Sequence, residues 1–121
     1  GVTEAATKWG LAEGRAGGEL GYQTYILLAN AGTVPANVTV TFLGDNNSPT
    51  PATQTVVVPA QRRVNVSVDP SFDPEEGGLV LTTFGALITS DQPIVVERAM
   101  YWNVNGEVWA AGTNATATRL P

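Results

Sequence analysis

The segment 24–44, TYILLANAGTVPANVTVTFLG, constrains the fold more than any other stretch of the chain. Two runs rich in β-branched and aromatic residues flank a turn-forming stretch at 30–35. The second run alternates between two rows of side chains: Val38, Val40 and Phe42 against Thr39 and Thr41. Because successive side chains of a strand point to opposite faces of the sheet, this alternation predicts a half-buried antiparallel strand. The segment therefore predicts two strands paired about a turn in an all-β chain.

The composition limits the class of protein. The 121 residues suffice for one domain with a two-layer core, and 43% of them are hydrophobic, as in ordinary globular domains. No apolar run approaches the roughly 18 residues that span a bilayer, so we expect no membrane insertion. Six basic and eleven acidic residues give a net charge of −5, which repels phosphate backbones and argues against a nucleic-acid partner.

The chain contains neither cysteine nor histidine. Their absence excludes disulfides, thiolate nucleophiles and imidazole acid–base chemistry, and it removes the ligands that soft metals prefer. We therefore expect no cofactor and no enzymatic activity. The abundance of Thr, Val, Ala, Gly and Asn, with a single Lys, favours an extracellular β-rich module.

Short apolar runs recur about every ten residues, a spacing typical of β-sandwiches and barrels. No apolar stripe with helical spacing persists over two turns, so we expect no helix. The predicted strands are residues 8–13, 23–30, 36–43, 53–58, 63–68, 79–90 (with a break at Gly85 left open), 93–102 and 107–112. The sequence SDQP at 90–93 predicts a tight hairpin turn, with Pro93 at the first position of its strand, where a missing N–H is harmless.

Parity assigns the side chains of two strands to faces. In the strand 63–68, Val64, Val66 and Val68 should face the core, and Asn65 and Ser67 should face water. In the strand 93–102 both rows contain apolar residues: Ile94, Val96, Arg98, Met100 and Trp102 in one, and Val95, Glu97, Ala99 and Tyr101 in the other. We therefore expect this strand to be central and partly covered on both sides.

Two charged residues share a predicted face with apolar neighbours. Glu13 follows Trp9 and Leu11 on one face of its strand, and Arg98 follows Val96 in another strand. Burying a single charge is costly, whereas a hydrogen-bonded pair approximately breaks even. We predict a structural ion pair between Glu13 and Arg98; the alternative is that each side chain reaches the edge of the sheet separately.

The two ends of the chain resemble each other. GVTEAATKW at 1–9 aligns with GTNATATRL at 112–120, with Gly, Ala, Thr and Lys/Arg in phase. A repeat unit from a tandem array leaves such a trace. We expect one β-sandwich domain over 1–121, in which 1–8 and 112–121 act as inter-repeat linkers or shared strands. The segment 112–121 would then cover a neighbour's strand edge in place of its own.

Acidic residues supply two candidate sites. Four carboxylates lie in the loop DPSFDPEE at 69–76 and offer oxygen ligands for a hard cation, but the spacing of a calcium loop is absent, and a solvated loop is the simpler interpretation. Whether this loop, from Asp69 to Glu76, binds a cation stays open. Glycosidase chemistry needs two carboxylates at a fixed separation. Glu13, Glu97 and Glu107 are more simply interpreted as structural.

Tyr101, Trp102 and Trp109 form a candidate aromatic site. Exposed Tyr and Trp stack on sugar rings or anchor protein interfaces. In a small sandwich, however, most Trp side chains fill the core. Core packing is the favoured interpretation, and a ligand or interface site at these three residues is the alternative.

Four landmarks occur in an order that resembles known families: WGLAEG at 9–14, LANAG at 28–32, VPAQR at 58–62 and SDQPIVV at 90–96. The order resembles the repeated β-sandwich domain of large bacterial secreted and surface proteins, in which LAEG near the start and VVERAMYW near the end recur in tandem. It also resembles the sensory rhodopsin transducer family, small β-sandwich proteins that assemble as tetramers, although this chain departs from that family from Glu97 onward.

The resemblance implies an all-β fold, an antiparallel immunoglobulin-like β-sandwich of about seven to eight strands. The first family implies a non-catalytic structural or adhesive module of a bacterial extracellular or surface protein, whose partners are neighbouring repeats or further copies. The second implies a soluble, cytoplasmic binding or signalling module that acts as a homo-oligomer. A carbohydrate-binding module that uses Tyr101, Trp102 or Trp109 is a further alternative. The similarity of the two ends favours the repeat module.

Overall fold

The computed structural model describes residues 4–16, 23–43, 53–68, 82–104 and 107–121. These residues contain strands and no helix. The strands are β1 Ala6–Ala16, β2 Gln23–Asn30, β3 Ala36–Leu43, β4 Thr53–Val58, β5 Arg62–Val68, β6 Thr82–Val104, β7 Glu107–Thr116 and β8 Thr118–Arg119. Every strand pair among them is antiparallel. The all-β, antiparallel fold class predicted from the sequence is therefore confirmed.

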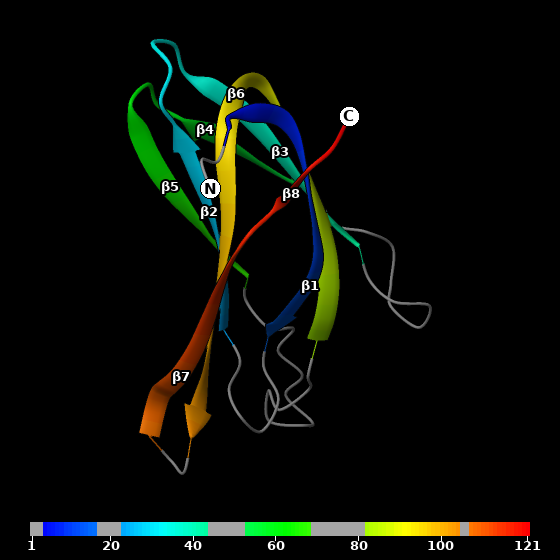
Figure 1. The fold of residues 1–121 in the computed structure, drawn as a ribbon, viewed down its shortest axis with the longest axis vertical. Helices are drawn as coiled ribbons and strands as arrows, with labels where there is room; N and C mark the ends of the chain where they lie inside the picture. The colour runs from blue at the N-terminus through cyan, green and yellow to red at the C-terminus, as the bar shows by residue number, and fades with distance from the viewer. Residues whose placement is uncertain (1–3, 17–22, 44–52, 69–81, 105–106) are drawn as a thin grey trace.

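The strands form two layers that share β6 (Figure 1). One layer has the order β4-β3-β6-β1-β8. In the other, β2 lies between β5 and β6, and β7 pairs with the opposite side of β6. The first part of β6 pairs with β1 and β3, and its second part pairs with β2 and β7. This long strand is thus the element that joins the two layers.

The hairpin predicted at 90–93 is wrong, because β6 continues through these residues. Figure 1 shows the bend where β6 passes from one layer to the other. Ser90 is the last residue of β6 paired with β3, and Val95 is the first paired with β2. Strands that change layers do so at bends or bulges. Pro93 is tolerated here because no ladder partner is assigned to it in either layer.

The pairing predicted between the two strands of the opening segment is also wrong. β2 pairs with β5 and β6, whereas β3 pairs with β4 and β6, so the two strands belong to different layers. The buried Asn30 amide organises the link between them: its Nδ2 donates to the carbonyls of Val34 (2.8 Å) and Val58 (3.0 Å), and its Oδ1 accepts from Gly32 N–H (2.9 Å). Residues 30–35 therefore connect two layers.

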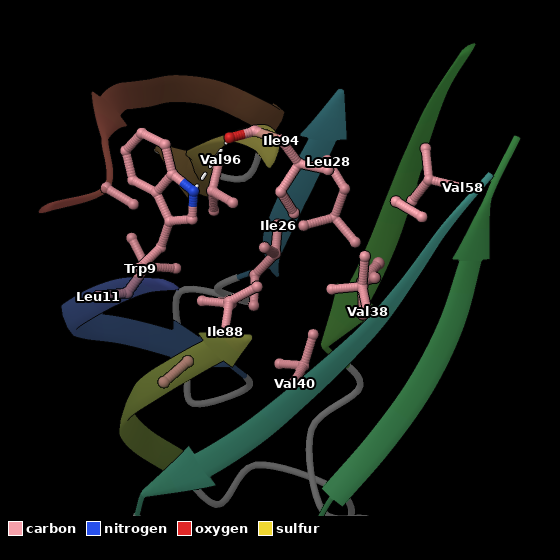
Figure 2. Close-up of a cluster of buried hydrophobic side chains, with 14 residues drawn as sticks. Trp9, Leu11, Ile26, Leu28, Val38, Val40, Val58, Ile88, Ile94 and Val96 are labelled. Atoms are coloured by element: carbon pink, nitrogen blue, oxygen red, sulfur yellow. Dashed lines mark hydrogen bonds between the residues drawn. The ribbon is translucent and has the colours of Figure 1, made fainter. Parts of the chain in front are cut away.

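The core lies between the layers and draws side chains from both (Figure 2). Its largest fully buried apolar members are Trp9, Ile26, Leu28, Ile88, Ile94, Val38, Val40, Val58 and Val96. The Trp9 ring is 2% exposed, and its Nε1 donates to the carbonyls of Ala6 and Ile94, both at 3.1 Å. The half-buried strand predicted for 36–43 is confirmed by the burial of Val38 and Val40. The strand predicted for 93–102 is central and covered on both rows, with Ile94 and Val96 buried on one row and Ala99 on the other.

The bounds of the strands agree with the sequence prediction where apolar and polar residues alternate regularly. β2, β3 and β4 have the predicted bounds, and β5 begins one residue earlier. β1 is longer than predicted and contains a register shift between Leu11 and Gly14. The buried row of β1 accordingly runs from Trp9 and Leu11 to Gly14.

The C-terminal segment pairs within its own chain. Residues up to Thr116 belong to β7 and pair with β6, and β8 pairs with Trp9 and Gly10 of β1. Arg119 also forms an ion pair with Glu4 at 2.7 Å, which joins the two ends. The prediction that this segment would cover a neighbour's edge in place of its own is therefore wrong.

Candidate binding face

An open concavity lies on the outer face of the layer formed by β5, β2, β6 and β7. Its lining residues are Tyr25 and Leu27 from β2, Asn65 from β5, and Ala99 and Tyr101 from β6, and its volume is about 480 Å³. These side chains point away from the core because their neighbours in sequence, such as Ile26 and Val66, are buried between the layers. The alternation of side chains between the two faces of the sheet therefore places these residues on the outer face, where they line the concavity.

Strand register brings the lining residues together. Tyr25 lies opposite Ala99 on one side and Ser67 on the other, and Leu27 lies opposite Asn65. The small Ala99 side chain, which is 4% exposed, leaves room for the two tyrosines to meet above it. The rings of Tyr25 and Tyr101 contact edge to face, with centroids 6.1 Å apart and planes at 65°, a favourable geometry for aromatic pairs.

Gly112 of β7 supports the position of the Tyr101 ring. The two residues are directly paired across β6 and β7. A Cβ atom at position 112 would lie 2.8 Å from Cδ1 of Tyr101, closer than side chains pack. The tyrosine ring therefore covers the glycine backbone, and a larger residue there would displace the ring.

Polar groups surround this aromatic centre. Gln23 Nε2 donates to Ser67 Oγ at 3.0 Å, and Ser67 is the residue of β5 that lies opposite Tyr25. Glu97 and Arg63 are exposed on the same face, on either side of Leu27 and Ala29. An apolar centre with a polar rim is the usual anatomy of a protein interface. None of the five residues that line the concavity carries a formal charge at neutral pH.

Only one of the three predicted aromatic site residues is placed at this concavity. Tyr101 lines it, but Trp102 is the next residue of β6 and points to the opposite face. Trp109 lies in β7, but its side chain is not among those described. Sequence reasoning missed the partners of Tyr101, which are Tyr25, Leu27, Asn65 and Ala99. The alternation of these residues with apolar ones can be recognised in the sequence. The strand register that brings them together cannot be, because it joins β2 to β5 and β6.

The predicted ion pair and the acidic loop fall largely outside the described part of the molecule. Arg98 is partly buried on the inner row of β6, whereas the side chain of Glu13 is not among those described, so the pair stays a prediction. The loop 69–76 likewise lies outside the described residues. Within the described ranges there is no group of three or more acidic side chains placed to hold a metal ion.

No helix in the described portion of the chain is long and apolar enough to cross a bilayer.

Comparison with known proteins identifies similar folds. No protein-family model and no curated protein sequence matches this chain. Among solved structures, Thermotoga maritima 1070 is similar with a TM-score of 0.76 and 17% sequence identity, over 96% of each chain. The Anabaena sensory rhodopsin transducer is similar with a TM-score of 0.56 and 26% identity, over 79% of this chain and 97% of the transducer. The similarity to the Thermotoga protein shows a shared fold. The similarity to the transducer agrees with the resemblance of the sequence to the sensory rhodopsin transducer family.

Proposed function

We propose that the protein is a non-catalytic structural and adhesive module of a bacterial extracellular or surface protein. In this proposal it holds a protein partner on the outer face of the layer formed by β5, β2, β6 and β7. The observation that carries the proposal is the open, uncharged concavity around Tyr25 and Tyr101. Tyrosine is enriched among the residues that dominate binding energy at protein interfaces.

The proposed location and the proposed lack of catalysis rest on composition. The chain has a single Lys, is rich in Thr and Asn, and lacks Cys and His. The concavity also lacks an acid–base pair among its lining side chains. A signalling role like that of the transducer family rests on the sequence resemblance and on the structural similarity, and we do not propose it.

Site-specific photo-crosslinking in the parent protein tests the partner. Asn65 is replaced with p-benzoylphenylalanine, and Lys8, an exposed residue on the outer face of the other layer, is replaced in the same way as a control. The proposal predicts adducts to a second polypeptide from position 65 and none from position 8. No polypeptide adduct at position 65, or equal adducts at both positions, would contradict it.

A neutral carbohydrate is the second candidate ligand, because two phenol rings and one amide line a site without formal charge. A glycan array probed with the wild-type chain and with the double variant Tyr25→Ala/Tyr101→Ala tests this alternative. Binding that the double variant loses would support it. No binding by the wild-type chain would remove it.

A further inference from the structure

β4 forms an exposed edge of the layer that contains β1, β3 and β8. Within the described chain it pairs with β3 alone. Thr53, Gln54, Thr55 and Val57 are exposed, and Val57 reaches 58%. The free side of an edge strand presents N–H and C=O groups that hydrogen-bond readily to another extended strand. The chemistry of this edge therefore suits a β-strand as its occupant.

The other edge strands of the described residues contain charged residues, and β4 does not. Arg62 and Arg63 open β5, Glu107 opens β7, and β8 contains Arg119. Charged residues on an edge disfavour pairing with a foreign strand. Among the four edge strands of the described residues, β4 (TQTVVV) is the one without a charged residue, and it also lacks proline and glycine. Its composition favours strand pairing.

A twofold axis can relate two copies of β4 as an antiparallel pair. Thr53, Thr55 and Val57 share the outer face, opposite Thr41, Thr39 and Asn37 of β3. An antiparallel pairing of two β4 strands with Thr55 on the axis places Thr53 against Val57 of the second copy, and Gln54 against Val56. Each side chain then meets one on its own face, as strand pairing requires.

Charge selects the same edge. Each copy carries a net charge of −5, so two copies repel each other, and an uncharged strand is the edge where that repulsion is least concentrated. We propose that β4 is a homodimerisation site, at which two copies join edge to edge in an antiparallel sheet with Thr55 on the twofold axis.

Disulfide trapping tests this register, since the chain has no cysteine of its own. In Thr55→Cys the two thiols of a dimer face each other at the Cα separation of an antiparallel pair, about 4.5–5.5 Å, which a disulfide spans. Thr53→Cys and Val57→Cys are controls on the same face of the same strand. Each control variant alone should form disulfide-linked dimers slowly. A mixture of the two should crosslink readily, because the pairing sets position 53 of one copy against position 57 of the other. Association raises the effective thiol concentration, so we expect Thr55→Cys to crosslink about tenfold faster than either control alone.

Light scattering of the wild-type chain and of Thr55→Lys provides a second readout. The proposal predicts a dimer that dissociates at least tenfold more readily in the lysine variant, while Tyr25→Ala/Tyr101→Ala leaves it intact because it alters another face. Equal crosslinking of all three cysteine variants, or a wild-type monomer at millimolar concentration, would overturn the proposal. Crosslinks from position 55 to a different polypeptide, without self-adducts, would assign the edge to a foreign strand and also overturn it.

Discussion

At the residue scale, Asn30 is the buried polar side chain that holds the connection between β2 and β3. It is 2% exposed and makes three hydrogen bonds with main-chain groups, including one with Val58 at the end of β4. Asn30→Ala removes the donor to the Val58 carbonyl in a buried hydrogen bond and two further bonds that hold the connection, so we expect the free energy of unfolding to fall by about 2–3 kcal/mol. Urea unfolding followed by tryptophan fluorescence measures the change. Asn65→Ala, at an exposed position, should stay within about 0.5 kcal/mol of wild type; similar losses for both variants would contradict this role.

Asp91 gives stability a pH dependence that can be isolated. Hydrogen bonds from the Asn37 side chain (2.7 Å) and backbone N–H (2.8 Å) lower the pKa of Asp91 from its ordinary 3.8. Because the folded state binds the proton more weakly, this contribution is present above the unfolded pKa and is lost as pH falls through the folded pKa. The urea midpoint of wild type should exceed that of Asp91→Ala at pH 6, and the difference should shrink below pH 3.8. A difference that does not change with pH would refute the assignment.

Gln61 carries backbone strain in the turn between β4 and β5. Its φ of 58° lies in the left-handed region, and the turn closes through a hydrogen bond from Arg62 N–H to the Pro59 carbonyl at 3.2 Å. A side chain is disfavoured in this conformation, whereas glycine adopts it freely. We expect Gln61→Gly to raise the free energy of unfolding by about 0.5 kcal/mol. Ala60→Gly, at a neighbour without positive φ, should lower it by about the same amount. Destabilisation by both variants would show that the strain is absent.

At the scale of elements, the irregular part of β1 is fitted to the first part of β6. Gly14 follows the register shift in β1 and pairs with Phe84, whose ring would lie 2.3 Å from a Cβ at position 14. The Phe84 ring also packs edge to face on Phe42, with centroids 5.7 Å apart, so it has little freedom to retreat. Gly14→Ala should therefore cost about 1–3 kcal/mol of stability.

The Phe84→Leu background identifies the cause of this cost. The shorter side chain makes space for the new methyl group, so the penalty of Gly14→Ala should shrink in the double variant. Chemical denaturation of all four proteins completes the cycle. An equal penalty in both backgrounds would place the cause in the backbone of β1 instead of in the Phe84 ring.

The elements also show how far sequence patterns reach. The bounds of β2, β3 and β4 were predictable because regular alternation of apolar and polar residues is a local property. At the two connections that cross between layers, at 30–35 and within β6, the turn-forming residues predict hairpins that the structure does not contain. Turn-forming residues mark a change of chain direction, but whether the flanking strands pair together or join different sheets depends on partners far away in sequence.

At the scale of the whole molecule, the candidate face combines predictable and unpredictable parts. The sequence makes Tyr101 a candidate because it adjoins Trp102 and lies near Trp109, and exposed Tyr and Trp side chains stack on sugar rings or anchor protein interfaces. Its union with Tyr25 and Leu27 required the antiparallel register that sets Tyr25 against Ala99. That register depends on the fold of both layers, so the concavity could not be inferred from the spacing of its residues.

The arrangement of the face assigns most of the proposed binding energy to the two tyrosines. Photo-crosslinking from position 65 in the parent protein, repeated in the Tyr25→Ala/Tyr101→Ala background, measures that share directly. Loss of two anchor residues, at more than about 1 kcal/mol each, predicts a fall in adduct yield of roughly tenfold or more under subsaturating conditions. Circular dichroism and urea unfolding confirm that the variant is folded. An undiminished yield of the same adduct from a folded double variant would contradict the proposal that this face holds the partner.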